Sequence, residues 1–203
     1  DEVSKLVGSC ITLSKNSIYV ADRYGSIFGL SNKNEIRYSL YEDFNLYFGE
    51  PIMKFIKKEL DNNQLQPYYN TNCVNKDDEE YENIKITIVY GLSILGTIIK
   101  MIQIPDILYK QFMTLQLVMG MYRNTKPILG NDFDKYISKH RLSHNIINGD
   151  MLKQFLFLNK HDQIEIVNSF NDLWKYQNGN NAISECNVEY FWNIINDFNK
   201  SLV

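Results

Sequence analysis

Two histidines, His140 and His144, have the four-residue spacing that places two metal ligands on one face of a helix. Arg141 follows the first of them, and no Glu lies between them to serve as the general base of a metalloprotease. A neighbouring positive charge disfavours a bound cation. We therefore interpret both as surface histidines and His161 as the start of a helix. The sequence predicts neither a metal site nor a cofactor.

Four consecutive acidic residues, Asp77 to Glu80, are a second group that could bind a metal ion. Four carboxylates in a row converge on one ion only if a turn-forming Gly folds the chain back, as in a calcium-binding loop. None is present here. The surrounding segment, Asn62 to Asn83, is polar and contains a Pro, so it is interpreted as a solvated loop.

Three cysteines, Cys10, Cys73 and Cys186, form no CxxC pair, which argues against a disulfide framework and a zinc module. This pattern is typical of a reducing compartment. We expect a cytoplasmic location, and a nuclear location is the alternative. A nucleophilic thiolate needs a His, a cation or a helix N-terminus beside it. Only Cys186 precedes a predicted helix, and the sequence predicts no catalytic residue within this chain.

The composition narrows the class of protein further. With 203 residues, of which 44% are hydrophobic, the chain can bury a core. Its formal net charge of -3 lacks the basic excess of a nucleic-acid-binding domain. Neither GxSxG nor a Walker-type loop nor GxGxxG occurs, so hydrolase, nucleotidase and dinucleotide-binding activities have no support.

The first 35 residues differ from the rest of the chain. CITL, SIYVA and SIFGL are short β-rich runs separated by the turn formers Ser14 to Asn16 and Asp22 to Gly25. We expect a small β hairpin or meander here. From Glu35 onward, the apolar spacing indicates helices, the first of which is predicted after Pro51, with Ile52, Phe55, Ile56 and Leu60 on one face.

The segment from Ile86 to Ile104 is long enough to cross a membrane. Its polar residues recur every three or four positions, which predicts one polar stripe on a buried core helix; they are Tyr90, Ser93, Thr97 and Lys100. We therefore expect no membrane span. Asp106 is expected to cap the next helix, and further helices are predicted at Asp150 to Leu158, at Asp162 to Val167 with a capping box, and around Val188 to Phe198.

The C-terminal third contains, in order, Leu152 and Phe155, then Asp172, Trp174, Tyr176 and Gly179, and finally Phe191 and Trp192. This order of features resembles the stretch of HECT-type ubiquitin-protein ligases in which the N-lobe passes into the C-lobe. Upstream, the run YGLSILGTIIKMIQIPDILYKQFM is similar to a helix pair of the family, with Gly91, Leu95, Gly96, Ile99, Tyr109, Lys110 and Met113 in the matching places.

The resemblance implies a mainly α (α+β) fold, with a helical N-lobe-like domain and a small N-terminal β hairpin or meander. After the β-rich segment at residues 1–35, which is predicted from its own pattern, it implies the N-lobe-like domain at 36–168 and a hinge with the start of a C-lobe-like segment at 169–203. The hinge itself is expected around Val167, Asn168, Ser169 and Phe170.

The resemblance also implies a function, in which a Cys thioester carries ubiquitin from a conjugating enzyme to a substrate Lys. None of the three cysteines matches the family's acceptor, so the nucleophile would lie outside this chain. The module that recruits the conjugating enzyme has room only between Thr114 and Lys139 and is expected to be missing. Ubiquitin and the conjugating enzyme are the expected partners, with no nucleic acid and no membrane.

Two other interpretations stay open. The chain could be a non-catalytic helical protein-interaction domain, including a degenerate relative of the ligases that is kept for binding. Alternatively, Cys10 to Leu30 could belong to a β-propeller blade joined to a helical region, which would require further repeats upstream of Asp1.

Overall fold

A computed structural model describes residues 5–32, 40–59, 87–126, 143–178 and 186–200. These residues form seven β-strands in two antiparallel sheets, together with four α-helices. The expectation of a mainly helical fold is therefore wrong, and the chain is α+β. It divides into two compact units, one built on the sheets and one on the helices.

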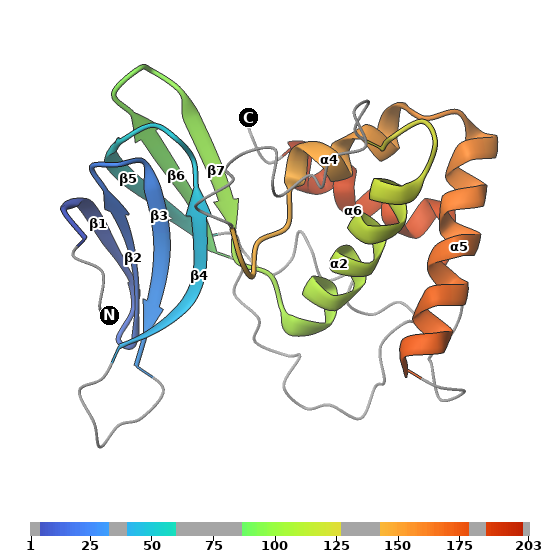
Figure 1. Cartoon of the computed structure of the whole chain (residues 1–203), viewed down its shortest axis with the longest axis horizontal. Helices are drawn as coiled ribbons and strands as arrows, with labels where there is room; N and C mark the ends of the chain where they lie inside the picture. Colours follow the sequence, from blue (N-terminus) through green and yellow to red (C-terminus); the bar gives the residue numbers. More distant parts are fainter. Residues whose placement is uncertain (1–4, 33–39, 60–86, 127–142, 179–185, 201–203) are drawn as a thin grey trace. The chain divides into compact units, whose positions relative to one another are not determined.

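The sheet unit comprises Asp1–Leu60, Lys85–Gln103 and Asn131–Ile146. Its first sheet is a four-stranded meander in the order β1-β2-β3-β4 (Figure 1). The strands are β1 (Val7–Ser14), β2 (Ser17–Asp22), β3 (Ser26–Ser31) and β4 (Tyr41–Tyr47). The three β-rich runs of the N-terminal segment thus form strands, as expected. Beyond β4, the segment at His144 forms a β-bridge with Asn45.

The second sheet is a three-stranded meander of β5 (Ile52–Glu59), β6 (Thr87–Ser93) and β7 (Ile98–Ile102). Two predicted helices were wrong here. The helix after Pro51 is strand β5, and the helix from Ile86 to Ile104 is the β6–β7 hairpin. The first half of the matched HECT helix pair is therefore a hairpin, and only its second half, which contains Tyr109, is helical.

The pattern in β5 was misread because the strand contains an irregularity. Its register against β6 shifts between Ile52 and Lys54, so Met53 is an extra residue. This places Ile52 and Phe55, three residues apart, among the same buried side chains. An extra residue in a strand changes the spacing of its buried side chains from two to three, which is also a helical spacing. A spacing of three therefore indicates a helix only where no such extra residue is present.

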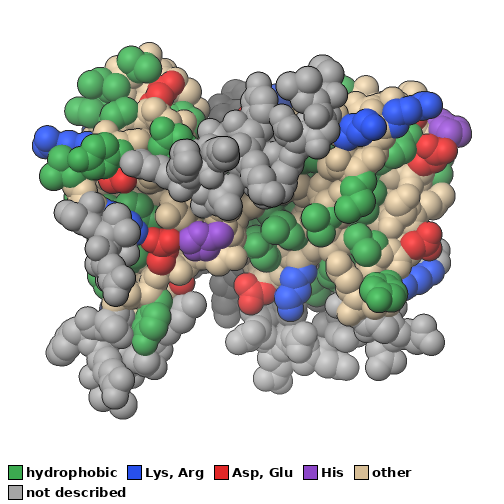
Figure 2. Space-filling model, in the orientation of Figure 1, with side chains coloured by type: hydrophobic (Ala, Val, Ile, Leu, Met, Phe, Trp, Pro, Cys, Tyr) green, Lys and Arg blue, Asp and Glu red, His purple; other side chains and the backbone are tan. Residues whose placement is uncertain are grey.

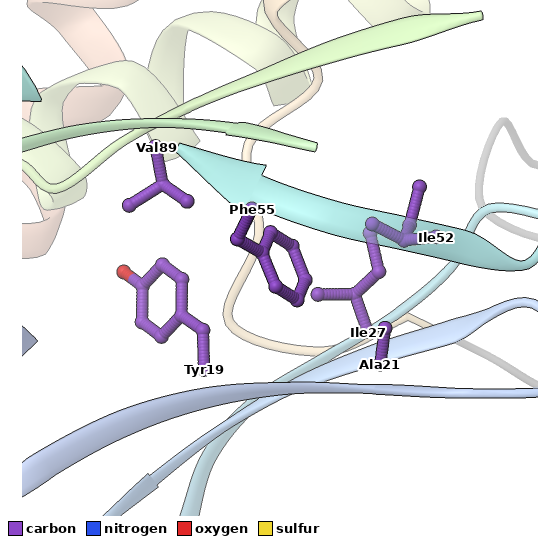
Figure 3. Packing of buried hydrophobic residues seen from close by; sticks show 6 residues of the cluster. All are labelled: Tyr19, Ala21, Ile27, Ile52, Phe55 and Val89. Atoms are coloured by element: carbon purple, nitrogen blue, oxygen red, sulfur yellow. The ribbon is translucent and has the colours of Figure 1, made fainter. Parts of the chain in front are cut away.

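The core of the sheet unit lies between the two sheets. Tyr19, Ala21 and Ile27 of the first sheet pack against Ile52, Phe55 and Val89 of the second, and their side chains point toward one another in Figure 3. Strands β1 and β5 are also tied together, because the Ser9 hydroxyl donates to the Ile52 carbonyl at 2.7 Å. The Lys57 ammonium likewise donates to the Leu13 carbonyl at 2.8 Å.

The helical unit comprises Asp61–Ile84, Ile104–Gly130 and Ile147–Val203. Its helices are α2 (Asp106–Met121), α4 (Gly149–Gln154), the short 3-10 helix η3 (Phe155–Phe157), α5 (Lys160–Asn178) and α6 (Val188–Lys200). The helices predicted after Pro105 and around Val188 are confirmed. The one predicted at Asp162 to Val167 is much longer, and the N-cap position of α2 is occupied by Pro105 rather than Asp106.

Aromatic side chains form much of the helical core. The Phe170 ring lies 4.8 Å from the Phe191 ring and stacks on Trp174 at 5.7 Å, measured between centroids. Phe155, Phe170 and Phe191 are all fully buried. Within the residues that the structure describes, no helix is long and apolar enough to cross a bilayer.

Candidate functional site

The residues singled out by the ligase resemblance lie at several separate places in the fold. Gly91 is in β6, and Leu95 and Gly96 are in the turn between β6 and β7. Tyr109 is in α2, where burial raises the pKa of its phenol. Phe191 and Trp192 are neighbours on α6, with Phe191 buried and Trp192 partly exposed.

The expected hinge, Val167, Asn168, Ser169 and Phe170, lies in the middle of α5. The helix runs through it without interruption, and Val167 and Phe170 are buried. Trp174 is one turn further along the same helix. The Ser169 hydroxyl donates to the Glu165 carbonyl at 2.9 Å, which is a local contact within the helix.

The cysteines and histidines that could do chemistry also lie apart. Cys10 is exposed on β1, and Cys186 is buried just before α6. The Asn171 amide holds the backbone of Cys186 through two hydrogen bonds, of 2.9 and 3.0 Å. His140, Cys73, Gly179 and the acidic run from Asp77 fall outside the described residues.

One polar cluster lies at the start of α5, where the sequence predicted a capping box but no contact with Tyr122. His161, Asp162 and Glu165 have ligand atoms within 4.8 Å of one another, the arrangement of a potential metal site. The Tyr122 hydroxyl lies 2.8 Å from Asp162 Oδ1 and 2.7 Å from Glu165 Oε2. Because it has one proton, the hydroxyl can donate to only one of these carboxylates at a time.

The Asp162 carboxylate has its other oxygen engaged as well. Asn124 and Asn159 donate to Oδ2 at 2.8 and 3.1 Å, and the backbone N–H of Asp162 donates to the Asn159 side chain at 2.8 Å. Asn159 is therefore the cap of α5, rather than Asp162 as the sequence suggested. The hydrogen bonds from Tyr122 and Asn124, in that order, lower the pKa of Asp162. The cluster is a capping network.

The turn between β6 and β7 is the second candidate site, and hydrogen bonds to Ser93 fix its backbone. The Ser93 hydroxyl accepts hydrogen bonds from the backbone N–H groups of Leu95 and Thr97, at 3.2 and 3.0 Å. The same hydroxyl donates to Glu50 Oε2 at 2.5 Å. Ser93 N–H also donates to the Thr97 carbonyl, and Gly96, with φ of 88°, supplies the left-handed residue.

The side chains at this turn are apolar. Ile94 is 61% exposed and Leu95 is 75% exposed, although Gly, Asn, Asp and Ser are the usual residues of tight turns. Ile98 at the start of β7 is exposed too, and so is Met53, the extra residue of β5. Figure 2 shows hydrophobic side chains gathered at this end of the β6–β7 hairpin. We call Met53, Ile94, Leu95 and Ile98 the hairpin tip.

A backbone hydrogen bond connects the hairpin tip to the start of β5. The backbone N–H of Ile94 donates to the carbonyl of Pro51 at 3.1 Å, which fixes the turn to the start of β5. Immediately behind it, Gly91 faces the core, where an added Cβ would lie 2.7 Å from Ile99. Leu95 and Gly96, chosen from sequence as family positions, are therefore turn residues of this tip.

Comparison with the models of known protein families gives no match, and no curated protein matches the sequence either.

Proposed function

We propose that this chain is a protein-interaction scaffold whose hairpin tip binds a protein partner. The observation that supports this proposal is the exposure of Ile94 and Leu95 on a turn that Ser93 and Glu50 hold in place. Single exposed apolar residues are common, but a group of four at one end of a hairpin and its neighbouring strand is typical of an interaction site.

The physical argument concerns the entropy of binding. A flexible loop loses conformational freedom when it docks, and this loss opposes association. The hydrogen bonds of Ser93 fix the backbone of the turn before any partner arrives. Two preorganised aliphatic side chains that enter a partner's pocket bury apolar surface at a lower entropic cost than the same side chains on a flexible loop.

The fold is compatible with a scaffold. Two antiparallel sheets that pack face to face occur in β-sandwiches and also between the four-stranded blades of a β-propeller. The propeller interpretation of Cys10 to Leu30 stays a prediction, because it requires further repeats upstream of Asp1. Fold alone does not determine function, so the proposal depends on the hairpin tip.

Catalysis as part of a HECT-type ligase, with ubiquitin and a conjugating enzyme as partners, is a separate proposal that depends on the sequence resemblance. Its test is whether the protein containing this chain forms a reducible thioester with ubiquitin. The hairpin-tip proposal requires no such thioester, so the two proposals can be distinguished.

The test of the scaffold proposal uses the double variant Ile94→Asn, Leu95→Asp. Both new residues favour turns, so we expect the free energy of unfolding to change by less than about 0.5 kcal/mol. Partners captured by the wild-type chain from an extract of its source cells are purified, and each is titrated against both proteins by calorimetry. We expect the double variant to bind at least ten times more weakly.

Leu40→Asn is the matched control, because Leu40 is 61% exposed in the same unit but is not part of the hairpin tip. It should bind as the wild type does. Equal affinity of the double variant and the wild type for every purified partner would disprove the proposal.

A further inference from the structure

The sheet face that continues from the hairpin tip carries several positive charges. Because residues paired across an antiparallel ladder share a face, the register of β5, β6 and β7 defines this face residue by residue. We call it the lysine face. Its three rows are Lys54–Leu92–Ile98, Ile56–Tyr90–Lys100 and Lys58–Ile88–Ile102. It is the face turned away from the core, which contains Phe55, Val89 and Ile99 instead.

The charge of the lysine face has one sign. Three of its nine positions are lysines and none is acidic, in a chain with an overall net charge of -3. Each row combines one lysine with two hydrophobic side chains. Ile56 and Ile98 are 45% and 63% exposed, whereas Ile88 is fully buried and Lys100 is half-buried. The face is therefore open to solvent along β5 and at Ile98.

The lysines on this face also affect one another. The pKa of Lys100 is lowered, first by burial and second by the positive charge of Lys58. Bringing carboxylates to this face would relieve that repulsion, whereas bringing further cations would increase it. The face is thus electrostatically complementary to an acidic surface.

We propose that the partner that binds the hairpin tip also covers the exposed part of the lysine face, and that it does so with a protein segment in which Asp or Glu alternates with aliphatic residues. The exposed part consists of Lys54, Ile56, Lys58 and Ile98. This inference rests on the scaffold proposal above and specifies its partner. Ile98 belongs to both the tip and the face, so one partner segment can contact both without a gap.

A protein segment fits this face better than a phosphate backbone does. The lysines are separated by aliphatic side chains, and only Tyr90 among the nine positions offers an aromatic ring for base stacking. An amphipathic segment matches both components, because its aliphatic residues cover Ile56 and Ile98 while its carboxylates meet the exposed ammonium groups of Lys54 and Lys58.

The test is a selection from a displayed library of random 16-residue peptides on the full chain. Peptides that also bind the Ile94→Asn, Leu95→Asp variant are discarded, so those retained depend on the hairpin tip. We expect the retained peptides to be enriched in Asp and Glu as well as in aliphatic residues. Their affinity for Lys54→Glu, Lys58→Glu should be at least ten times lower than for wild type.

Lys15→Glu is the matched control, because Lys15 is an exposed lysine of the same unit in the β1–β2 turn. It should bind the selected peptides as the wild type does. Circular dichroism and thermal unfolding establish that each variant is folded before its affinity is compared.

Three results would overturn the inference. Tip-dependent peptides without acidic enrichment would leave the scaffold proposal standing and disprove the acidic partner. Failure to retain any tip-dependent peptide would count against both proposals. Binding of vesicles with 30% phosphatidylserine, or of a 20-base-pair DNA duplex, that is lost in Lys54→Glu, Lys58→Glu would show that the face serves phosphate groups.

Discussion

Tyr90 and Lys100 are paired across the β6–β7 hairpin, at equal distances along the chain from Leu95. Ser93 and Thr97 pair in the same way at the turn, through the hydrogen bond from Ser93 N–H to the Thr97 carbonyl. The four polar residues that suggested a helical stripe are therefore one cross-strand pair and the pair that closes the turn. Their spacing is symmetric about the turn, which imitates helical periodicity.

The first prediction concerns the charge of Lys100. Lys58→Gln should raise the pKa of Lys100 by removing the like charge, while burial still holds it below the ordinary value. The pKa is measured from the pH dependence of the Lys100 side-chain carbon shifts in NMR spectra. A lysine with a lowered pKa binds fewer protons in the folded state, so stability rises with pH between its folded pKa and the ordinary value near 10.5.

In the Lys58→Gln variant, that rise in stability with pH should be smaller. Lys15→Gln is the control, because Lys15 lies in the β1–β2 turn rather than on the lysine face. A pKa of Lys100 that is the same in wild type and Lys58→Gln would contradict the prediction.

The second prediction compares two glycines of the same hairpin. An added Cβ at Gly91 would lie 2.7 Å from Ile99 and 3.3 Å from Phe55, so Gly91→Ala overpacks the core. We expect it to destabilise the sheet unit by about 1–3 kcal/mol. Gly96→Ala meets no neighbouring atom but must adopt a φ of 88°, which costs about 1–2 kcal/mol.

Asn tolerates the left-handed region better than Ala. Substitution by Asn therefore separates backbone strain at position 96 from overpacking at position 91. Gly96→Asn should be more stable than Gly96→Ala, and Gly91→Asn should be no better than Gly91→Ala. Urea unfolding followed by circular dichroism measures both pairs. If Asn rescued position 91 and failed at position 96, the assignment of strain and overpacking would be wrong.

Some elements could be predicted from sequence because their local signals agree with their environment. The N-terminal strands alternate with clear turn formers, and α2 and α6 have apolar residues at helical spacing. For β5 and the β6–β7 hairpin, an irregular register and a symmetric turn produced spacings of three and four. The β-branched residues Thr87, Ile88 and Val89 were the local signal for a strand.

The hairpin tip could be predicted only in part. Leu95 of the tip and Gly96 of its turn were singled out, but as members of a helix. The turn is mostly apolar and contains few of the residues that usually indicate a turn. The capping network was missed for another reason. Tyr122 and Asp162 are 40 residues apart in sequence, and no local pattern indicates that α2 ends beside the start of α5.

The third prediction is a pH dependence of the helical unit. The pKa of Asp162 is lowered in the folded protein, chiefly by the hydrogen bond from Tyr122. Its stabilising effect is therefore present above the ordinary carboxyl pKa near 3.8 and is lost as the pH falls through the folded value. We expect Asp162→Asn to be less stable than wild type at pH 7, with the difference narrowing below about pH 4.

Both tryptophans, Trp174 and Trp192, lie in α5 and α6, so their fluorescence reports unfolding of the helical unit. Urea titrations at pH 7, 5 and 3 give the stability difference between wild type and variant. Asp172→Asn, an exposed change on the same helix, should produce no such narrowing. A difference that stayed constant down to pH 3 would rule out the proposed role of the ionised carboxylate.

The fourth prediction addresses the residues that the ligase resemblance marks as a hinge. Val167 and Phe170 are 3% and 0% exposed, and the Phe170 ring packs on Phe191 and Trp174. Bending α5 there would remove these side chains from the core. We expect the amides of Val167 to Phe170 to exchange with deuterium as slowly as the neighbouring turns of α5.

Phe170→Ala tests the cause of that protection. Removing a fully buried Phe ring should destabilise the helical unit by about 3–5 kcal/mol and accelerate exchange along α5. Tyr176→Ala is the control, because Tyr176 is 87% exposed on the same helix and should change the stability by less than about 0.5 kcal/mol. Fast exchange confined to Val167 to Phe170 in the wild type would instead support a hinge at this position, because a local opening exposes only the amides of the segment that bends.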